Sequence, residues 1–171
     1  LPLFLDGARL GYALAADGND LTIQDIARLC DVFYIGGTKV GALFGEAVVI
    51  PDPNFIDSFR SLIKQRGGLL AKGRLLGIQF DTLFTDDLYT KIARNANDMA
   101  YQIRDIFVSN GYPLLFDSPT NQQYPIMSDE ELAIIGQSDL LTLKKTIYVA
   151  NLAENEINEP ENNRHYMAVK E

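Results

Sequence analysis

The order of predicted elements in the first fifty residues is typical of an α/β fold. Apolar runs at residues 3–5 and 32–35 indicate buried strands, and a segment with helical spacing lies between them. A third apolar run at 42–50 follows a loop and ends at Pro51-Asp52-Pro53. Strand, helix, strand, loop, strand is the order expected of an α/β domain.

Each of these elements has its own local signal. The strand Leu3–Leu5 is stopped by Asp6-Gly7, which leaves an acid at its carboxyl end. Thr22 is expected to cap a helix that runs through Cys30, because apolar residues recur at helical spacing behind it. The segment 36–39, Gly-Gly-Thr-Lys, predicts a loop that needs backbone freedom.

From residue 54 the apolar spacing becomes helical until Gly67-Gly68 interrupts it. The longest helix is expected to follow a Thr85 cap and to stop at Asn110-Gly111. Its predicted buried stripe comprises Leu88, Ile92, Met99, Ile103 and Ile106. Short strands at 114–116 and 124–127, joined by a polar turn, then predict a small α+β lobe.

Composition limits the classes of function. The 171 residues are 47% hydrophobic, enough for a buried core, and the net charge of −8 argues against a nucleic-acid partner. The single cysteine, Cys30, is expected to be a small buried residue in a reducing compartment, which favours the cytoplasm. No apolar run is long enough for a membrane helix, and both ends of the chain look cut.

Two polar motifs are candidates for chemistry. Asp6-Gly7-Ala8-Arg9 ends one strand and Gly36-Gly37-Thr38-Lys39 ends another, so both are expected at the ligand-binding edge of the sheet. An amine, a carboxylate and a guanidinium suit a cofactor that forms a Schiff base with lysine. The alternative is a turn, a surface ion pair and a solvated lysine.

Both motifs resemble one enzyme family. The segments LFLDGARLGYAL and DIARLCDVFYIGGTKVGALFGEAVVI resemble the threonine aldolase and β-eliminating lyase family, which depends on pyridoxal 5'-phosphate and has the aspartate aminotransferase type of fold. The similarity continues through IKQRGGLLAKGRLLGIQF and FDSPTNQQYPIM, over about residues 1–127. It implies part of a cofactor-binding large domain at 1–53, connecting helices and a small α+β domain at 54–134, and a divergent tail at 135–171.

The resemblance also implies roles for particular residues. Lys39 would bear the cofactor, Asp6 would pair with its pyridine nitrogen, and Arg9 would grip the substrate carboxylate. Thr38 would help to orient the cofactor. Lys72 would reach the phosphate, with Arg74 as the competing residue. Metal ligands are not expected.

Several features depart from the family. Phe4 stands where many relatives have histidine, and the family's amino-terminal half, which supplies the ring-stacking residue and the phosphate-binding helix start, has no counterpart in the sequence. We therefore expect uncovered apolar faces. The only histidine, His165, lies in a polar tail, where DLLTLKKTIYVANLAENEI resembles Obg-like ATPases through Asn151 and Glu154. No phosphate-binding P-loop accompanies that tail.

The function implied is a lyase that cleaves a β-hydroxy amino acid to glycine and an aldehyde, incomplete in this chain. A related β-eliminating lyase or aminotransferase is the first alternative. A non-catalytic fragment or fusion product is the second. The family further implies a homo-oligomer, a dimer or tetramer with shared active sites, and the sequence does not identify the catalytic base.

Overall fold

The computed structural model describes residues 1–137, which fall into two compact units. The first unit spans Leu1–Ile126. The second begins at Met127, and its described part is helix α6 (Asp129–Gly136), which starts with a reciprocal cap between Ser128 and Glu131. The predictions for Asn151, Glu154 and His165 lie outside the described residues.

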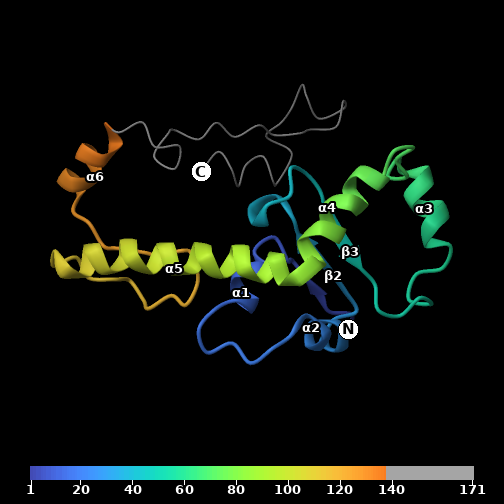
Figure 1. Ribbon diagram of the computed structural model, residues 1–171, viewed down its shortest axis with the longest axis horizontal. Helices are drawn as coiled ribbons and strands as arrows, with labels where there is room; N and C mark the ends of the chain where they lie inside the picture. The colour runs from blue at the N-terminus through green and yellow to red at the C-terminus, as the bar shows by residue number, and fades with distance from the viewer. Residues whose placement is uncertain (138–171) are drawn as a thin grey trace, which may run out of the picture. The chain divides into compact units, whose positions relative to one another are not determined.

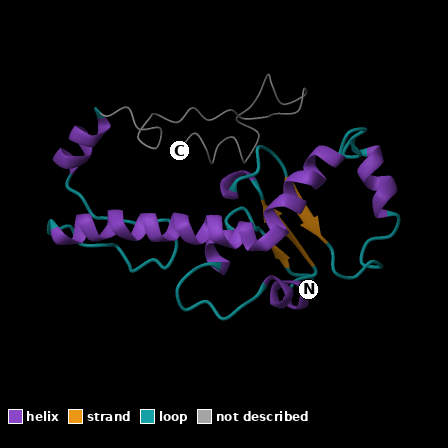
Figure 2. Ribbon diagram, in the orientation of Figure 1, coloured by secondary structure: helices purple, strands orange, loops and turns teal. Residues whose placement is uncertain are grey.

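The first unit is built on a three-stranded sheet in the order β1-β2-β3 (Figures 1 and 2). Strand β1 (Phe4–Leu5) is parallel to β2 (Val32–Gly36), and β3 (Glu46–Val49) is antiparallel to β2. The α/β class is confirmed, with a small mixed sheet. The predicted third strand, 42–50, is shorter because Gly41 and Gly45, with φ of 100° and 89°, turn the backbone before it.

Five helices accompany this sheet in the described part of the first unit. Helix α2 has the predicted cap, in which the Thr22 hydroxyl accepts from Asp25 N at 3.2 Å, and it ends at the buried Cys30. The helix expected from residue 54 begins only at Phe59, after a series of turns. The helices are α1 (Leu10–Leu14), α2 (Ile23–Leu29), α3 (Phe59–Gln65), α4 (Arg74–Phe84) and α5 (Leu88–Ser109), with 3-10 turns η1 (Thr38–Val40) and η2 (Thr85–Asp87).

One face of the sheet is covered by α1 and α5. Phe33 and Ile35 point to this side, where Phe33 is 1% exposed and packs in the core with Leu10 and Ala93. Side chains alternate along a strand, so the opposite face carries Phe4, Tyr34 and Val48.

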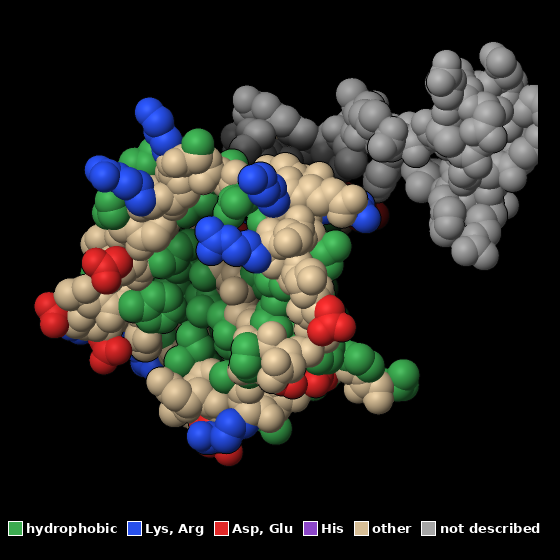
Figure 3. Space-filling model, turned by 90° about the vertical axis from the view of Figure 1, so that its right-hand side faces the viewer, with side chains coloured by type: hydrophobic (Ala, Val, Ile, Leu, Met, Phe, Trp, Pro, Cys, Tyr) green, Lys and Arg blue, Asp and Glu red, His purple; other side chains and the backbone are tan. Residues whose placement is uncertain are grey.

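That opposite face is open in the described part of the chain. Phe4 of β1 and Val48 of β3 are each 61% exposed, so the prediction of a buried strand at 3–5 is wrong at Phe4. Val48 also borders a cavity of about 290 Å³ lined by Ile50, Pro53, Ile56 and Phe59. Figure 3, which views the side carrying α3 and α4, shows hydrophobic side chains in a hollow with Lys and Arg side chains along its upper edge. The expected uncovered apolar faces are therefore present.

Helix α5 differs from its prediction at its start. It begins at Leu88, after Asp86 and Asp87 adopt left-handed φ angles of 51° and 59°. The Thr85 hydroxyl donates to Asp81 O at 2.8 Å instead of capping α5, so it completes the end of α4. The predicted cap is wrong because a local hydroxyl can serve either of two adjoining helices.

The buried face of α5 also differs. Met99, Ile103 and Ile106, from the predicted stripe, are between 46% and 62% exposed, whereas Tyr89 and Asn97 are buried. The Asn97 amide N–H donates to Tyr12 O of α1 at 3.0 Å, while Asn97 Oδ1 has no partner in the described part of the chain. The face that packs on the core carries Tyr89, Ile92, Ala93 and Ala96, so the predicted stripe is right at Ile92 and wrong from Met99 onward.

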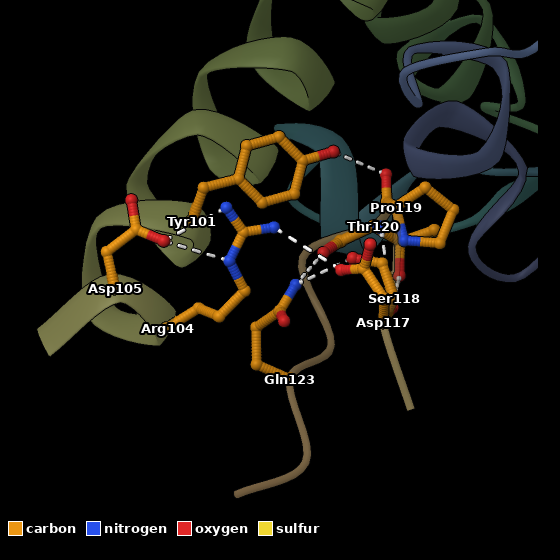
Figure 4. A network of polar contacts seen from close by, with 8 residues as sticks. All are labelled: Tyr101, Arg104, Asp105, Asp117, Ser118, Pro119, Thr120 and Gln123. Carbon is orange, nitrogen blue, oxygen red and sulfur yellow. Dashed lines mark hydrogen bonds and ion pairs between the residues drawn. The ribbon is translucent and has the colours of Figure 1, made fainter. Parts of the chain in front are cut away.

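The predicted strands at 114–116 and 124–127 reduce to one bridge between Leu114 and Pro125. Proline has no N–H to extend a ladder. The turn that joins them is held against α5 instead (Figure 4): Tyr101 OH donates to Pro119 O at 2.6 Å, and the Arg104 guanidinium lies 3.6 Å from Asp117. Within residues 1–137, no helix has both the length and the apolar character to cross a membrane.

Candidate functional site

The two polar motifs meet at one edge of the sheet. Asp6 follows β1, and Thr38 and Lys39 lie in η1, immediately after β2. Because β1 and β2 are parallel, their carboxyl ends are neighbours. The Gly36 N–H donates to Gly7 O at 2.9 Å and joins the two loops directly.

Two glycines permit this close approach. A Cβ on Gly7 would lie 1.6 Å from the carbonyl oxygen of Tyr34, and a Cβ on Gly36 would lie 2.6 Å from that of Ala8. Neither separation is compatible with a side chain, since backbone atoms are the obstacles. The glycines of both motifs are thus required to bring Asp6 near the Lys39 loop.

The Asp6 carboxylate is held in its ionised form. The Tyr34 hydroxyl and then the Ala8 N–H, at 3.0 Å, donate to Oδ1 and hold the pKa of Asp6 below its ordinary range; burial opposes this, and the charges of Lys39 and Arg9 reinforce it. The same hydrogen bond to Asp6, followed by burial, raises the pKa of Tyr34 to about 12. The acid is therefore a carboxylate at neutral pH.

Two tyrosines from other elements fix the backbone around Lys39. Tyr12 of α1 donates its hydroxyl to Lys39 O, and Tyr89 of α5 donates to Gly36 O at 3.0 Å. The next residue, Val40, is fully buried and so anchors the loop in the core. The loop is fixed by its backbone, whereas the Lys39 side chain is exposed.

The cationic groups of the site, Arg9 and Lys39, are exposed. Among residues 1–137, neither the Lys39 ammonium nor the Arg9 guanidinium has a hydrogen-bond or ion-pair partner. Thr38 is exposed beside Lys39. The charges of Lys39 and Arg9 both act on the Asp6 carboxylate, but no contact between these groups is present in the described part of the chain.

Lys72 makes no described contact with Asp6, Arg9 or Lys39. It occupies the turn before α4 and borders a pocket of about 380 Å³ with Ala71, Arg74 and Leu75. Helix α4 is tied to the loop after Lys39 through Gln79, whose side-chain oxygen accepts from Leu43 N at 2.7 Å. No described contact joins Lys72 to Asp6 or Lys39, so its phosphate role stays a prediction.

Tyr12, Tyr34 and Tyr89 are the site residues that the sequence motifs did not indicate. Tyr34 could have been found by pairing the two apolar runs as parallel strands, which sets it beside Asp6. Tyr12 and Tyr89 come from helices whose packing on the sheet has no local signal.

The comparisons with known proteins agree on one relationship. No family model matches the chain. The low specificity L-threonine aldolase of Pseudomonas aeruginosa is 29% identical over 130 residues, which are 75% of this chain and 38% of that protein. The enzyme of the same name from a Pseudomonas species is 30% identical over 133 residues, 77% of this chain and 38% of its own length.

A solved structure extends the similarity to the fold. The threonine aldolase of Leishmania major matches with a TM-score of 0.75 and 38% sequence identity, over 99% of this chain and 51% of that one. The chain thus spans between about two fifths and one half of the length of these relatives. It is related to the threonine aldolases and corresponds to part of their structure.

Proposed function

We propose that this chain forms the lysine-bearing part of a pyridoxal-phosphate-dependent lyase that cleaves a β-hydroxy amino acid into glycine and an aldehyde. The observation that carries the proposal is the joining of the Asp6 turn to the Lys39 loop through Gly7 and Gly36. The relationship to threonine aldolases supports it. The large-domain and small-domain organisation implied by the aspartate aminotransferase type of fold is part of the same proposal.

The residues present suit the cofactor. When bound, pyridoxal phosphate supplies an electron sink for the bond broken at the substrate α-carbon. Lys39 Nζ, which is exposed and unpaired within residues 1–137, is the attachment point. The ionised Asp6 keeps a proton on the pyridine nitrogen, and Thr38 helps to orient the ring. Lys72 is proposed to reach the phosphate.

Arg9 is proposed to bind the substrate carboxylate. A guanidinium offers two parallel N–H donors to a carboxylate and keeps its charge at every physiological pH. In the cleavage, the β-hydroxyl gives its proton to a base, the Cα–Cβ bond breaks, and Cβ leaves as the aldehyde carbonyl carbon. The bonding electron pair stays on Cα, which is then protonated to give glycine.

The rest of the active site is proposed to come from polypeptide that the longer relatives carry and from a second copy in a homodimer or tetramer. The exposed apolar side chains of the open sheet face, Phe4 and Val48, support association, because soluble monomers rarely expose contiguous apolar surface. Cleavage by residues 1–171 alone is expected to be weak or absent, because those other parts of the active site are not in this sequence.

The assignment of Lys39 is tested by chemical trapping. Residues 1–171 are incubated with pyridoxal phosphate, reduced with borohydride and digested, and the modified lysine is located by mass spectrometry. We expect modification at Lys39 and its loss in Lys39→Ala. The control, Lys64→Ala, changes an exposed lysine of α3 and should leave the trapping intact. Trapping that persists in Lys39→Ala at the wild-type level would contradict the assignment.

Reaction type is tested on the chain joined to the missing parts of a threonine aldolase relative. Threonine should give glycine and acetaldehyde. Pyruvate and ammonia from serine or tryptophan would instead identify a β-eliminating lyase, and transfer of the amino group to an oxo acid would identify an aminotransferase. No product with any of these substrates would support a non-catalytic role.

A further inference from the structure

Tyr34 stands beside Asp6 because of strand register. Phe4 lies opposite Val32 and Leu5 opposite Phe33, so the next position along the parallel pair sets Tyr34 next to Asp6 on the open face. The Phe4 and Tyr34 rings lie on this face with centroids 6.1 Å apart. The Tyr34 hydroxyl donates to Asp6 Oδ1. A neighbouring strand thus delivers a donor to the acid without any loop rearrangement.

The two oxygens of Asp6 have different surroundings. Both hydrogen bonds, from Tyr34 and from Ala8 N, end on Oδ1. Within residues 1–137, Oδ2 accepts none. A carboxylate held at one oxygen by two donors from different directions has a fixed orientation, and its second oxygen keeps its capacity to accept a hydrogen bond.

We propose that Tyr34 is a positioning residue that holds Asp6 through Oδ1 and reserves Oδ2 for the protonated ring nitrogen of the cofactor. The inference rests on the proposed function for the identity of that partner. Its structural half, the coupling of Tyr34 to Asp6, concerns only residues of this chain. Tyr34 contacts the acid and not the reacting atoms.

The chemical consequence is a weaker base at Asp6. A hydroxyl that donates to a carboxylate draws negative charge from it and favours the ionised form. The proton shared with a pyridine nitrogen then stays on the nitrogen, where it strengthens the electron sink. The other charges that act on the pair are Lys39 and Arg9, which favour ionised Asp6, and Glu46 of β3, which opposes ionisation of Tyr34.

The coupling is tested without cofactor. The side-chain carboxyl carbon of Asp6 is followed by NMR during an acid titration of residues 1–171, with the signal assigned by its loss in Asp6→Asn. Tyr34→Phe keeps the ring and removes the hydroxyl, so the Asp6 titration midpoint should move upward. Tyr101→Phe, which removes a hydroxyl bonded to Pro119 O instead, should leave that midpoint unchanged. An unchanged midpoint in a Tyr34→Phe protein with the wild-type circular dichroism spectrum would overturn the proposal.

A reciprocal measurement covers the case in which Tyr34→Phe does not fold. The ultraviolet absorbance of ionising tyrosine is titrated in the wild type and in Asp6→Asn. The wild type should contain two tyrosines with a pKa of about 12, Tyr34 and Tyr89, and Asp6→Asn should lower the pKa of Tyr34 alone. No change in the alkaline titration would refute the pairing.

A third readout separates this inference from the proposed function. Tyr34→Phe should still be trapped at Lys39 by borohydride, but the pH at which the bound cofactor changes its absorption should shift. Failure to trap Lys39 in the wild type would refute the proposed function and leave the measured Tyr34–Asp6 coupling intact. Wild-type trapping with an identical absorption profile in Tyr34→Phe would refute the positioning role alone.

Discussion

Replacing Tyr89 by phenylalanine should measure how strongly α5 holds the Lys39 loop. Tyr89 is 3% exposed, and its hydroxyl donates to Gly36 O at 3.0 Å across 53 residues of sequence. The ring packs on Phe84 with centroids 5.3 Å apart, a contact that phenylalanine preserves. Only the buried donor is removed. A buried carbonyl left without its donor costs about 1–3 kcal/mol, a large fraction of the stability of a small unit.

The assay is urea unfolding followed by far-ultraviolet circular dichroism, with the midpoint and slope compared between proteins. Tyr101→Phe is the matched control, because its hydroxyl bonds to Pro119 O at an exposed site where water can replace it. We expect a loss below about 1 kcal/mol there. Equal, small losses for both variants would show that the Tyr89 hydroxyl does not stabilise the loop.

Three further outcomes follow from local geometry. Gly11→Ala should lower the unfolding free energy by about 1–3 kcal/mol, since a Cβ there would meet an α5 aromatic ring at 2.9 Å, whereas Gly77→Ala, with open space around it inside α4, should raise it by about 0.5–1 kcal/mol. Thermal melts that shift in the same direction for both would contradict this. Thr22→Ala should cost about 1 kcal/mol through loss of the α2 cap, measured by urea unfolding. A hydrogen bond from Tyr34 to Asp6, and the cap hydrogen bonds from Thr22 to Asp25, hold the pKa values of both acids below 3.8 in the folded protein. Their contribution to the free energy of unfolding is therefore present above about pH 4, and it is lost as the pH falls through the folded-state pKa values. Asp25→Asn should flatten that acid-side loss, and an unchanged pH profile would argue against it.

The edge of the sheet that carries Asp6 and Lys39 could largely be predicted from the sequence, because the signals for its strands and loops are local. Short apolar runs ended by Asp6-Gly7 and by Gly36-Gly37 mark two strand ends, and the Thr22 cap fixes the helix between them. A strand, helix and strand of these lengths bring both ends to one edge. The convergence of the Asp6 and Lys39 loops follows from connectivity alone.

The orientation of α5 could not be predicted in the same way. Its apolar residues at 99, 103 and 106 satisfy helical periodicity, but so does the neighbouring face with Tyr89, Ile92 and Ala93, which is the one that packs on the core. On that face Tyr89 and Asn97 also bond to backbone oxygens far away in sequence. Thr85 likewise stands between two helices and serves the first. Such choices depend on tertiary partners, which periodicity does not contain.

The contact between Gly7 and Gly36 restricts how this protein can vary. In most packed contacts, a larger side chain on one element is tolerated when a smaller one stands opposite, so the two positions change together in evolution. Here the obstacles to a Cβ at either glycine are main-chain oxygens, which no substitution can shorten. A second mutation therefore cannot make room for a side chain at either position. In a library that covers every single and double substitution, each glycine should be intolerant alone, and no change at one should rescue a change at the other.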